Sequence, residues 1–143
     1  MVRFWDSSAL IPLVIQEERS PACRRLFQEG VAIAVWSLTR TEMVSALWRR
    51  ARAGELDLAA MPRVLARLER LAAKWHEIGD LELVRDRAER LLEHHELRAA
   101  DALQLAAALV LSQEHPRGRD FVTADRVLAR AATREGFRVL IQK

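Results

Sequence analysis

Short apolar runs alternate along the chain with longer segments in which apolar residues recur every three or four positions. The short runs predict buried β-strands, and the longer segments predict helices with one apolar face. The expected strands are residues 2–5, 31–36, 120–123 and 138–141, with 76–79 at most a brief strand. The expected helices are residues 6–15, 20–30, 37–54, 56–75 (one helix, or two joined near Pro62), 81–97, 99–115 and 124–136.

The order of these elements decides the class of fold. Strands separated by helices favour parallel pairing, because the chain must cross back before the next strand begins. We therefore expect an α/β fold with a central parallel β-sheet of four to five short strands, flanked by helices on both faces. Residues 1–143 should form a single domain, since about 150 residues can bury about two thirds of their unfolded surface.

The composition is that of an ordinary globular protein, with 50% hydrophobic and 30% charged residues. The longest apolar run, residues 105–111, is far too short to cross a bilayer, and no signal-peptide core follows the N-terminus. We expect a cytoplasmic protein with no membrane association. Cys23 is the one cysteine, so it cannot form an internal disulfide, and we expect it to be a small buried hydrophobe.

The chain carries 23 Lys and Arg against 20 Asp and Glu, a formal net charge of +3. Nearly all the cations are Arg, whose planar guanidinium suits phosphate, so the charge permits a polyanionic partner without requiring one. The densest basic patches are Arg49, Arg50 and Arg52, and Arg63, Arg67 and Arg70 at helical spacing. Taken alone, each patch is better interpreted as a solvated helix face than as a phosphate contact.

Four acids stand near the starts of expected helices. Asp6 follows the strand at 2–5, Asp125 follows the strand at 120–123, and Glu42 lies six residues after the strand at 31–36. Asp101 begins the Ala-rich helix. In a parallel sheet the ligand crevice lies beyond the carboxyl ends of the strands, so these carboxylates are expected to meet at one edge.

Helix capping is the competing interpretation of each acid taken singly. Asp101 with Gln104, and Thr39 with Glu42, both have the spacing of a capping box. Several converging carboxylates, however, repel one another unless protons or hard cations neutralise them, and Mg²⁺ or Mn²⁺ prefers such oxygen ligands.

Hydroxyl groups lie beside these acids in the sequence. They are either helix caps or hydrogen-bond partners of a metal-bound water or a phosphate oxygen. The residues concerned are Ser7, Ser8 and Thr123.

The segments "FWDSSALIPLV", "RTEMVSAL", "RAADALQLAAAL" and "FVTADRVLARAATREGFRVL", in this order, resemble the PIN-domain nucleases, most closely the VapC-type toxins of bacterial toxin/antitoxin pairs. The resemblance runs nearly the whole length, although residues 55–95 match only in helical character. It places four residues of this chain on the acidic quartet of the family, with Thr123 and a serine of "DSS" (Ser7 or Ser8) as accessory hydroxyls. Those four catalytic candidates are Asp6, Glu42, Asp101 and Asp125.

The resemblance implies a metal-dependent endoribonuclease that hydrolyses RNA phosphodiester bonds and is the toxin component of a type II toxin/antitoxin system. Asp6, Asp101 and Asp125 would bind Mg²⁺ or Mn²⁺, and Glu42 would orient a water or complete the metal's shell. The implied partners are the RNA substrate, a cognate antitoxin protein and a second copy of the chain in a homodimer.

Two rival functions are open at this stage. A dehalogenase-type or receiver-type phosphoryl-transfer domain also has an Asp after its first strand, but the former needs D-x-D, where this chain has Ser7 and Ser8 after Asp6. A receiver needs a lysine after a late strand, and the only lysines are Lys74 and Lys143. The second rival is a non-catalytic binding module.

The adjacent histidines, His94 and His95, point about 100° apart on a helix, which is a poor geometry for sharing a metal. We expect them to be surface residues.

Overall fold

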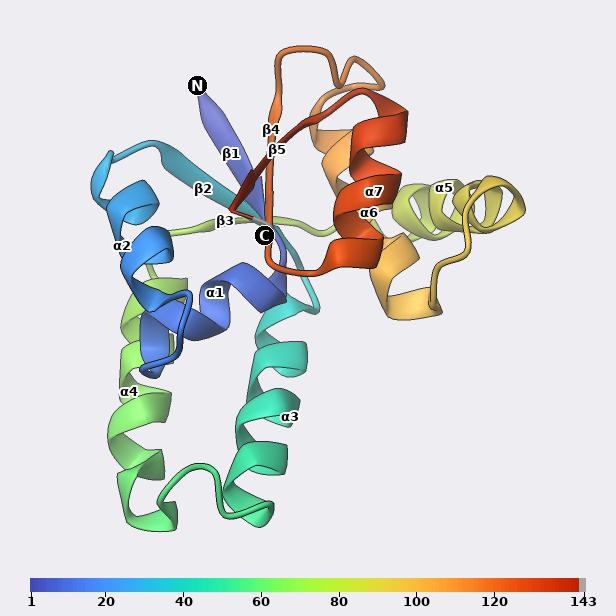
Figure 1. The fold of residues 1–143 in the computed structure, drawn as a ribbon. Helices are drawn as coiled ribbons and strands as arrows, with labels where there is room; N and C mark the ends of the chain where they lie inside the picture. Colours follow the sequence, from blue (N-terminus) through green and yellow to red (C-terminus); the bar gives the residue numbers. More distant parts are fainter. Residues whose placement is uncertain (142–143) are drawn as a thin grey trace.

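A computed structural model describes residues 1–141, so the last two residues of the expected domain, including Lys143, lie outside the described residues (Figure 1). Five strands form one parallel sheet in the order β3-β2-β1-β4-β5, which confirms the predicted fold class. The strands are β1 (Val2–Trp5), β2 (Ala32–Trp36), β3 (His76–Ile78), β4 (Asp120–Thr123) and β5 (Arg138–Ile141).

The helices also lie where the hydrophobic period predicts them, with ends shifted by a few residues. The expected helix over 56–75 is divided close to Pro62, because a proline lacks the N–H that a continuing helix would need. The helical elements are α1 (Ser7–Val14), α2 (Ser20–Gln28), α3 (Thr39–Arg52), the 3₁₀ turn η1 (Leu58–Ala60), α4 (Met61–Ala72), α5 (Leu81–His94), α6 (Ala99–Leu111) and α7 (Arg126–Glu135).

Helices cover both faces of the sheet, and each face has its own apolar core. Because successive strand residues point to opposite faces, Phe4 and Phe121 pack with α5, α6 and α7, whereas Trp5 and Val122 pack with α1 to α4. The Phe4 and Phe121 rings stack with centroids 5.3 Å apart. Cys23 is fully buried in the second core, as expected, and burial raises its thiol pKa to about 11.

The order of the strands creates a switch point beside β1. The chain moves from β1 to β2 and β3 on one side, and later places β4 and β5 on the other. β1 and β4 are therefore neighbours whose following helices leave from the same edge of the sheet. In open parallel sheets the ligand crevice forms at such a point.

The opposite, amino edge of the sheet is held by an ion cluster around the buried Asp120 carboxylate. Asp120 is paired in register with both Arg3 on β1 and Arg138 on β5. Its carboxylate accepts a 2.9 Å hydrogen bond from Arg3 Nε and a 2.7 Å bond from Arg138 Nε. These bonds, chiefly the one from Arg138, hold the pKa of Asp120 below its usual value. The cluster joins three strands at the end remote from the acids of interest.

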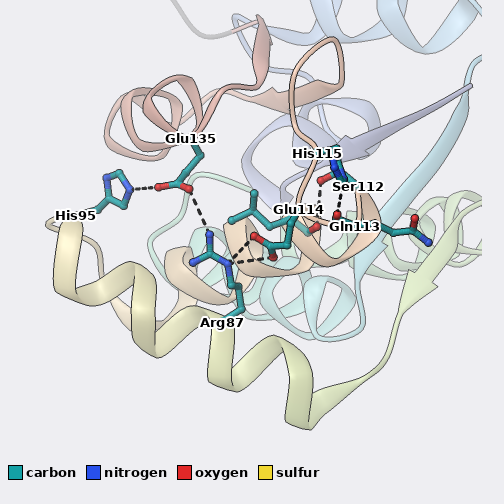
Figure 2. A network of polar contacts seen from close by, with 8 residues as sticks. Arg87, His95, Ser112, Gln113, Glu114, His115 and Glu135 are labelled. Carbon is teal, nitrogen blue, oxygen red and sulfur yellow. Dashed lines mark hydrogen bonds and ion pairs between the residues drawn. The ribbon is translucent and has the colours of Figure 1, made fainter.

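A second polar cluster joins α5, α7 and the turn after α6 (Figure 2). His95 Nε2 lies 2.6 Å from Glu135 Oε2, and Arg87 contacts both Glu135 and Glu114. The His95 side chain is only 6% exposed, so the expectation that both histidines are surface residues is wrong for His95 and correct for the exposed His94. Within residues 1–141, no helix is both long and apolar enough to span a lipid bilayer.

Candidate functional site

Asp6 lies directly after β1, where it caps α1 from a buried position. Its Oδ2 accepts hydrogen bonds from the hydroxyls of Ser8 and Thr123, both at 2.5 Å, and its Oδ1 accepts from the Ser8 backbone N–H at 3.2 Å. Ser7 donates a longer bond of 3.3 Å to Oδ1. The carboxylate of Asp6 is therefore fixed by groups from both β1–α1 and the end of β4.

The end of β4 is connected to the same cluster. The Ser8 hydroxyl accepts from the Ala124 N–H at 2.9 Å, and the Thr123 hydroxyl accepts from the Asp125 N–H at 3.0 Å. Asp125 caps α7 through a 2.9 Å bond from the Leu128 N–H to its Oδ1. The hydroxyls of Ser7, Ser8 and Thr123 thus all contact Asp6. They orient its carboxylate and do not point freely into a crevice.

Glu42 projects from the first turn of α3 towards α6. Its Oε1 accepts a 2.7 Å hydrogen bond from Gln104 Nε2, and the same nitrogen donates at 3.0 Å to Thr39 Oγ1. The predicted capping box between Thr39 and Glu42 is wrong: Leu38 is the N-cap residue, without a side-chain capping bond, and Thr39 is fully buried against Gln104. A long-range contact has replaced the local one.

Asp101 lies in the first turn of α6 but does not cap it. The N-cap residue is Arg98, again without a side-chain capping bond, so the capping interpretation of Asp101 with Gln104 is wrong. Gln104 is 1% exposed and faces Glu42 and Thr39. The Asp101 carboxylate is half-buried and does not cap α6, which removes the simplest structural reason for its presence.

The four acids influence one another electrostatically. Burial is the main cause that raises the pKa of Asp6, of Glu42 to about 7 and of Asp101 to about 6. Asp125 raises the pKa of Asp6 and Asp101, and Asp6 and Asp101 both raise that of Glu42. The sheet edge therefore gathers carboxylates that hold protons near neutral pH and would be stabilised as anions by a nearby cation.

The donor set suits a hard divalent cation. A groove of about 650 Å³ is lined by Asp101 and Asp125 together with residues 96–98, Ala100 and Val127. Carboxylate oxygens are the ligands that Mg²⁺ and Mn²⁺ prefer, and the mutual repulsion of these acids is the charge that such an ion would neutralise. Among residues 1–141, however, no three acidic, histidine or cysteine side chains form a group that could hold a metal as arranged.

Sequence reasoning missed the role of Gln104. The sequence suggests Gln104 only as a capping partner for Asp101, three positions earlier, whereas its side chain bonds to Thr39 and Glu42, more than 60 residues away in sequence. The signal available was a polar residue on an otherwise apolar helix face. Its Oε1 is buried without a hydrogen-bond partner, while its Nε2 bonds to both Thr39 and Glu42.

The fold and the site define a parallel α/β domain with carboxylates at its carboxyl edge. A PIN-domain family model matches residues 3–134, so the chain belongs to the PIN-domain family, a family of nucleases. This membership leaves the dehalogenase-type and receiver-type rivals without support. A comparison with curated proteins found no match.

Two solved structures are similar to the chain. PAE2754 from Pyrobaculum aerophilum is 28% identical with a TM-score of 0.63, over 98% of this chain and 92% of that one. FitAcB from Neisseria gonorrhoeae is 19% identical with a TM-score of 0.54, over 97% of this chain and 96% of that one. The second likeness shows the fold alone.

Proposed function

We propose that the chain is a metal-dependent endoribonuclease that hydrolyses RNA phosphodiester bonds. The observation that carries this proposal is the grouping of Asp6, Glu42, Asp101 and Asp125 at one edge of the sheet, where the acids raise one another's pKa. Capping accounts for Asp6 and Asp125 but not for Asp101 or Glu42. Membership of a nuclease family supports the same function.

Asp6, Asp101 and Asp125 would hold Mg²⁺ or Mn²⁺. A bound divalent ion would neutralise the carboxylates, lower the pKa of water and polarise the scissile phosphate. Bringing the three carboxylates to one ion requires side-chain movement from the arrangement described above, because they do not yet form a group that could hold a metal. Asp101, which has no capping bond to lose, is the acid freest to move.

The surrounding residues orient the acids at this edge by hydrogen bonds. Ser8 and Thr123 hold Asp6 in one orientation by donating to the same oxygen. Glu42, with a pKa of about 7, can hold or release a proton at neutral pH and is suited to orient an attacking water. Gln104 fixes the Glu42 carboxylate by its 2.7 Å bond.

We further propose that the chain is the toxin of a type II toxin/antitoxin pair, acting in the cytoplasm as one PIN-like domain over residues 1–143 and forming a homodimer. The resemblance of its four motifs to VapC-type toxins supports this assignment. The partner would be a cognate antitoxin protein that blocks nuclease activity.

A surface suited to such a partner lies between α1, α2 and α4. An apolar groove of about 570 Å³ is lined by Leu13, Phe27 and Leu71, and Arg24, Arg67, Arg70 and Lys74 lie along it. An apolar floor beside several cations favours an amphipathic segment that carries acidic residues. This chemistry is compatible with an antitoxin segment.

The test is cleavage of defined tRNA and rRNA substrates by purified protein freed of any partner, in Mg²⁺, Mn²⁺ or EDTA. Asp6→Asn and Asp101→Asn should abolish cleavage while remaining folded. Asp57→Asn is the matched control, because Asp57 caps the 3₁₀ turn beyond the far end of α3. It should cut as the wild type does.

Binding of Mn²⁺ gives an independent result. Asp101→Asn should weaken Mn²⁺ binding in parallel with the loss of cleavage, as expected for a direct ligand. Cleavage that persists in EDTA, or in folded Asp101→Asn protein, would contradict the metal-dependent mechanism. A wild type that binds neither metal nor RNA would favour the non-catalytic binding module.

A further inference from the structure

Three arginines form a row along α7. Arg126, Arg130 and Arg134 are spaced four residues apart, so each is displaced by one helical turn and only about 40° from the last. The row extends for about 12 Å. All three are exposed, and together they line a depression of about 410 Å³. Like charges at this spacing destabilise a helix, so the row has a cost that local structure does not explain.

The acidic residue on the same helix makes its ion pairs with other residues. Glu135 is the one acidic residue inside α7, and Figure 2 shows it directed to His95 and Arg87. Arg87 Nε in turn donates to both carboxylate oxygens of Glu114, at 3.0 and 3.1 Å. Within the described residues, Arg126, Arg130 and Arg134 form no ion pair.

The row is continuous with the acidic edge of the sheet. Arg126 directly follows Asp125, and a polar groove of about 360 Å³ carries Arg130 and Arg134 on its wall. That groove shares Glu96, Leu97 and Val127 with the groove that contains Asp101 and Asp125. His94 also lines the polar groove, and Glu96 is the acid within it. A strand lying in this groove would pass from the carboxylates directly to the arginines.

The basic patches on α3 and α4 are not continuous with the acidic edge of the sheet. Arg52 lies ten residues beyond Glu42 on α3, or about 15 Å along the helix axis. Arg50 of that patch is paired with Glu17 at 3.3 Å, and Arg67 of the α4 patch donates to the Val14 carbonyl. The row on α7 is the basic patch that begins at the acidic edge.

We propose that the α7 arginine row binds the sugar-phosphate backbone of the RNA strand on one side of the scissile bond. The inference rests on the proposed nuclease function and adds the path of the substrate. Guanidinium groups bind phosphate oxygens strongly without reading sequence, so the row would set the position of the strand and its affinity. The carboxylates would then act on the phosphate that this binding places beside them.

Binding of a fluorescently labelled single-stranded oligoribonucleotide, measured in EDTA across a range of salt concentrations, tests the path without metal or cleavage. The double variant Arg130→Ala with Arg134→Ala should bind at least about fivefold more weakly. Its log–log salt slope should fall by about 1.4, because each lost phosphate contact on a single strand removes about 0.7. The matched control, Arg49→Ala with Arg52→Ala, removes the same charge on α3 and should bind as the wild type does.

Two further measurements separate a specific path from a general loss of charge. Glu96→Gln should tighten binding, since it removes the acid from the proposed groove. With Mg²⁺ and a cleavable RNA, the α7 double variant should raise KM more than it lowers kcat, as expected for binding made equally in the ground and transition states.

An unchanged salt slope in the α7 double variant, or an equal loss in the α3 control, would overturn the inference. A wild type that does not bind the RNA would overturn it as well. Binding that follows the expected pattern without any cleavage in Mg²⁺ or Mn²⁺ would support the inference and count against the proposed nuclease instead.

Discussion

Gln104 on α6 donates a 2.7 Å hydrogen bond to Glu42 on α3, and this bond joins two helices that pack on opposite faces of the sheet. The same Gln104 nitrogen also donates to Thr39, and its own Oε1 is buried without a partner. Gln104 therefore holds the Glu42 carboxylate in place although its own carbonyl oxygen is left unsatisfied, which is destabilising.

Gln104→Met should reduce nuclease activity by about tenfold while changing the free energy of unfolding by less than about 1 kcal/mol. Methionine keeps the volume and removes both the donor and the unsatisfied carbonyl. Because the Gln104 bond lowers the pKa of Glu42, its loss should raise that pKa further above its present value of about 7. The pH–rate profile should shift to higher pH accordingly.

Thr39→Val is the control for this variant, because it removes the other acceptor of Gln104 Nε2 and leaves the bond to Glu42. It should affect stability more than the pH–rate profile. A Gln104→Met enzyme with an unshifted profile would show that Gln104 only packs.

The contacts of Thr39, Glu42, Asp101 and Gln104 could not be predicted from the sequence. Thr39 with Glu42, and Asp101 with Gln104, each have the spacing of a capping box, and neither box forms. Instead a member of one expected box bonds to both members of the other. The spacing within each pair allows either a local capping box or a long-range contact. Which of the two forms depends on how α6 packs against β2, and the sequence of a single helix does not contain that information.

Stability should fall as pH rises through the range set by Glu42 and Asp101. Their pKa values rise from 4.5 to about 7 and from 3.8 to about 6, so the folded protein holds protons that the unfolded chain releases. The stabilisation that these two carboxyl groups give the folded protein is complete below about pH 4 and is lost as pH approaches 7. Urea unfolding between these limits, without divalent ions, measures it.

Glu42→Gln with Asp101→Asn should flatten this pH dependence, since neither new side chain titrates. Saturating Mg²⁺ should also flatten it for the wild type by favouring the ionised carboxylates. An unchanged slope in the double variant would mean that these acids are not the source of the pH dependence.

Asp120→Asn should destabilise the protein by about 1–3 kcal/mol, because Arg138 loses its ion pair and the buried Arg3 keeps only Glu29 as a charged partner. The cluster lies at the amino edge of the sheet, so the activity of each folded molecule should stay near that of the wild type. The lowered pKa of Asp120 also predicts a loss of stability as pH falls below 3.8. Thermal unfolding at pH 3 and pH 7, with activity corrected for folded fraction, distinguishes these effects.

Arg87→Met should cost about 1–2 kcal/mol of stability, since Glu114 and the partly buried Glu135 lose their shared cation. Arg85→Met is the matched control, because Arg85 is an exposed arginine on the same helix. Equal losses in the two variants, measured by urea unfolding, would show that the network in Figure 2 adds no stability of its own.

The strands and helices were predictable because the apolar period within each segment agrees with its burial in the sheet or on one helix face. His95 was not, because its burial depends on Glu135, which lies 40 residues later on another helix. The acids at the ends of β1 and β4 were predictable from parallel topology. Which hydroxyl contacts which acid, and that Asp101 caps nothing, required the packed structure.

The burial of Cys23 has a practical consequence for spectroscopy. With its thiol enclosed and its pKa at about 11, maleimide and methanethiosulfonate reagents should leave it untouched at neutral pH. A cysteine introduced at Val127, which is 52% exposed and lies where the two grooves join, would then be the one reactive thiol. The wild-type background already permits a single fluorophore or spin label there, so strand occupancy could be followed in real time without first removing a native cysteine.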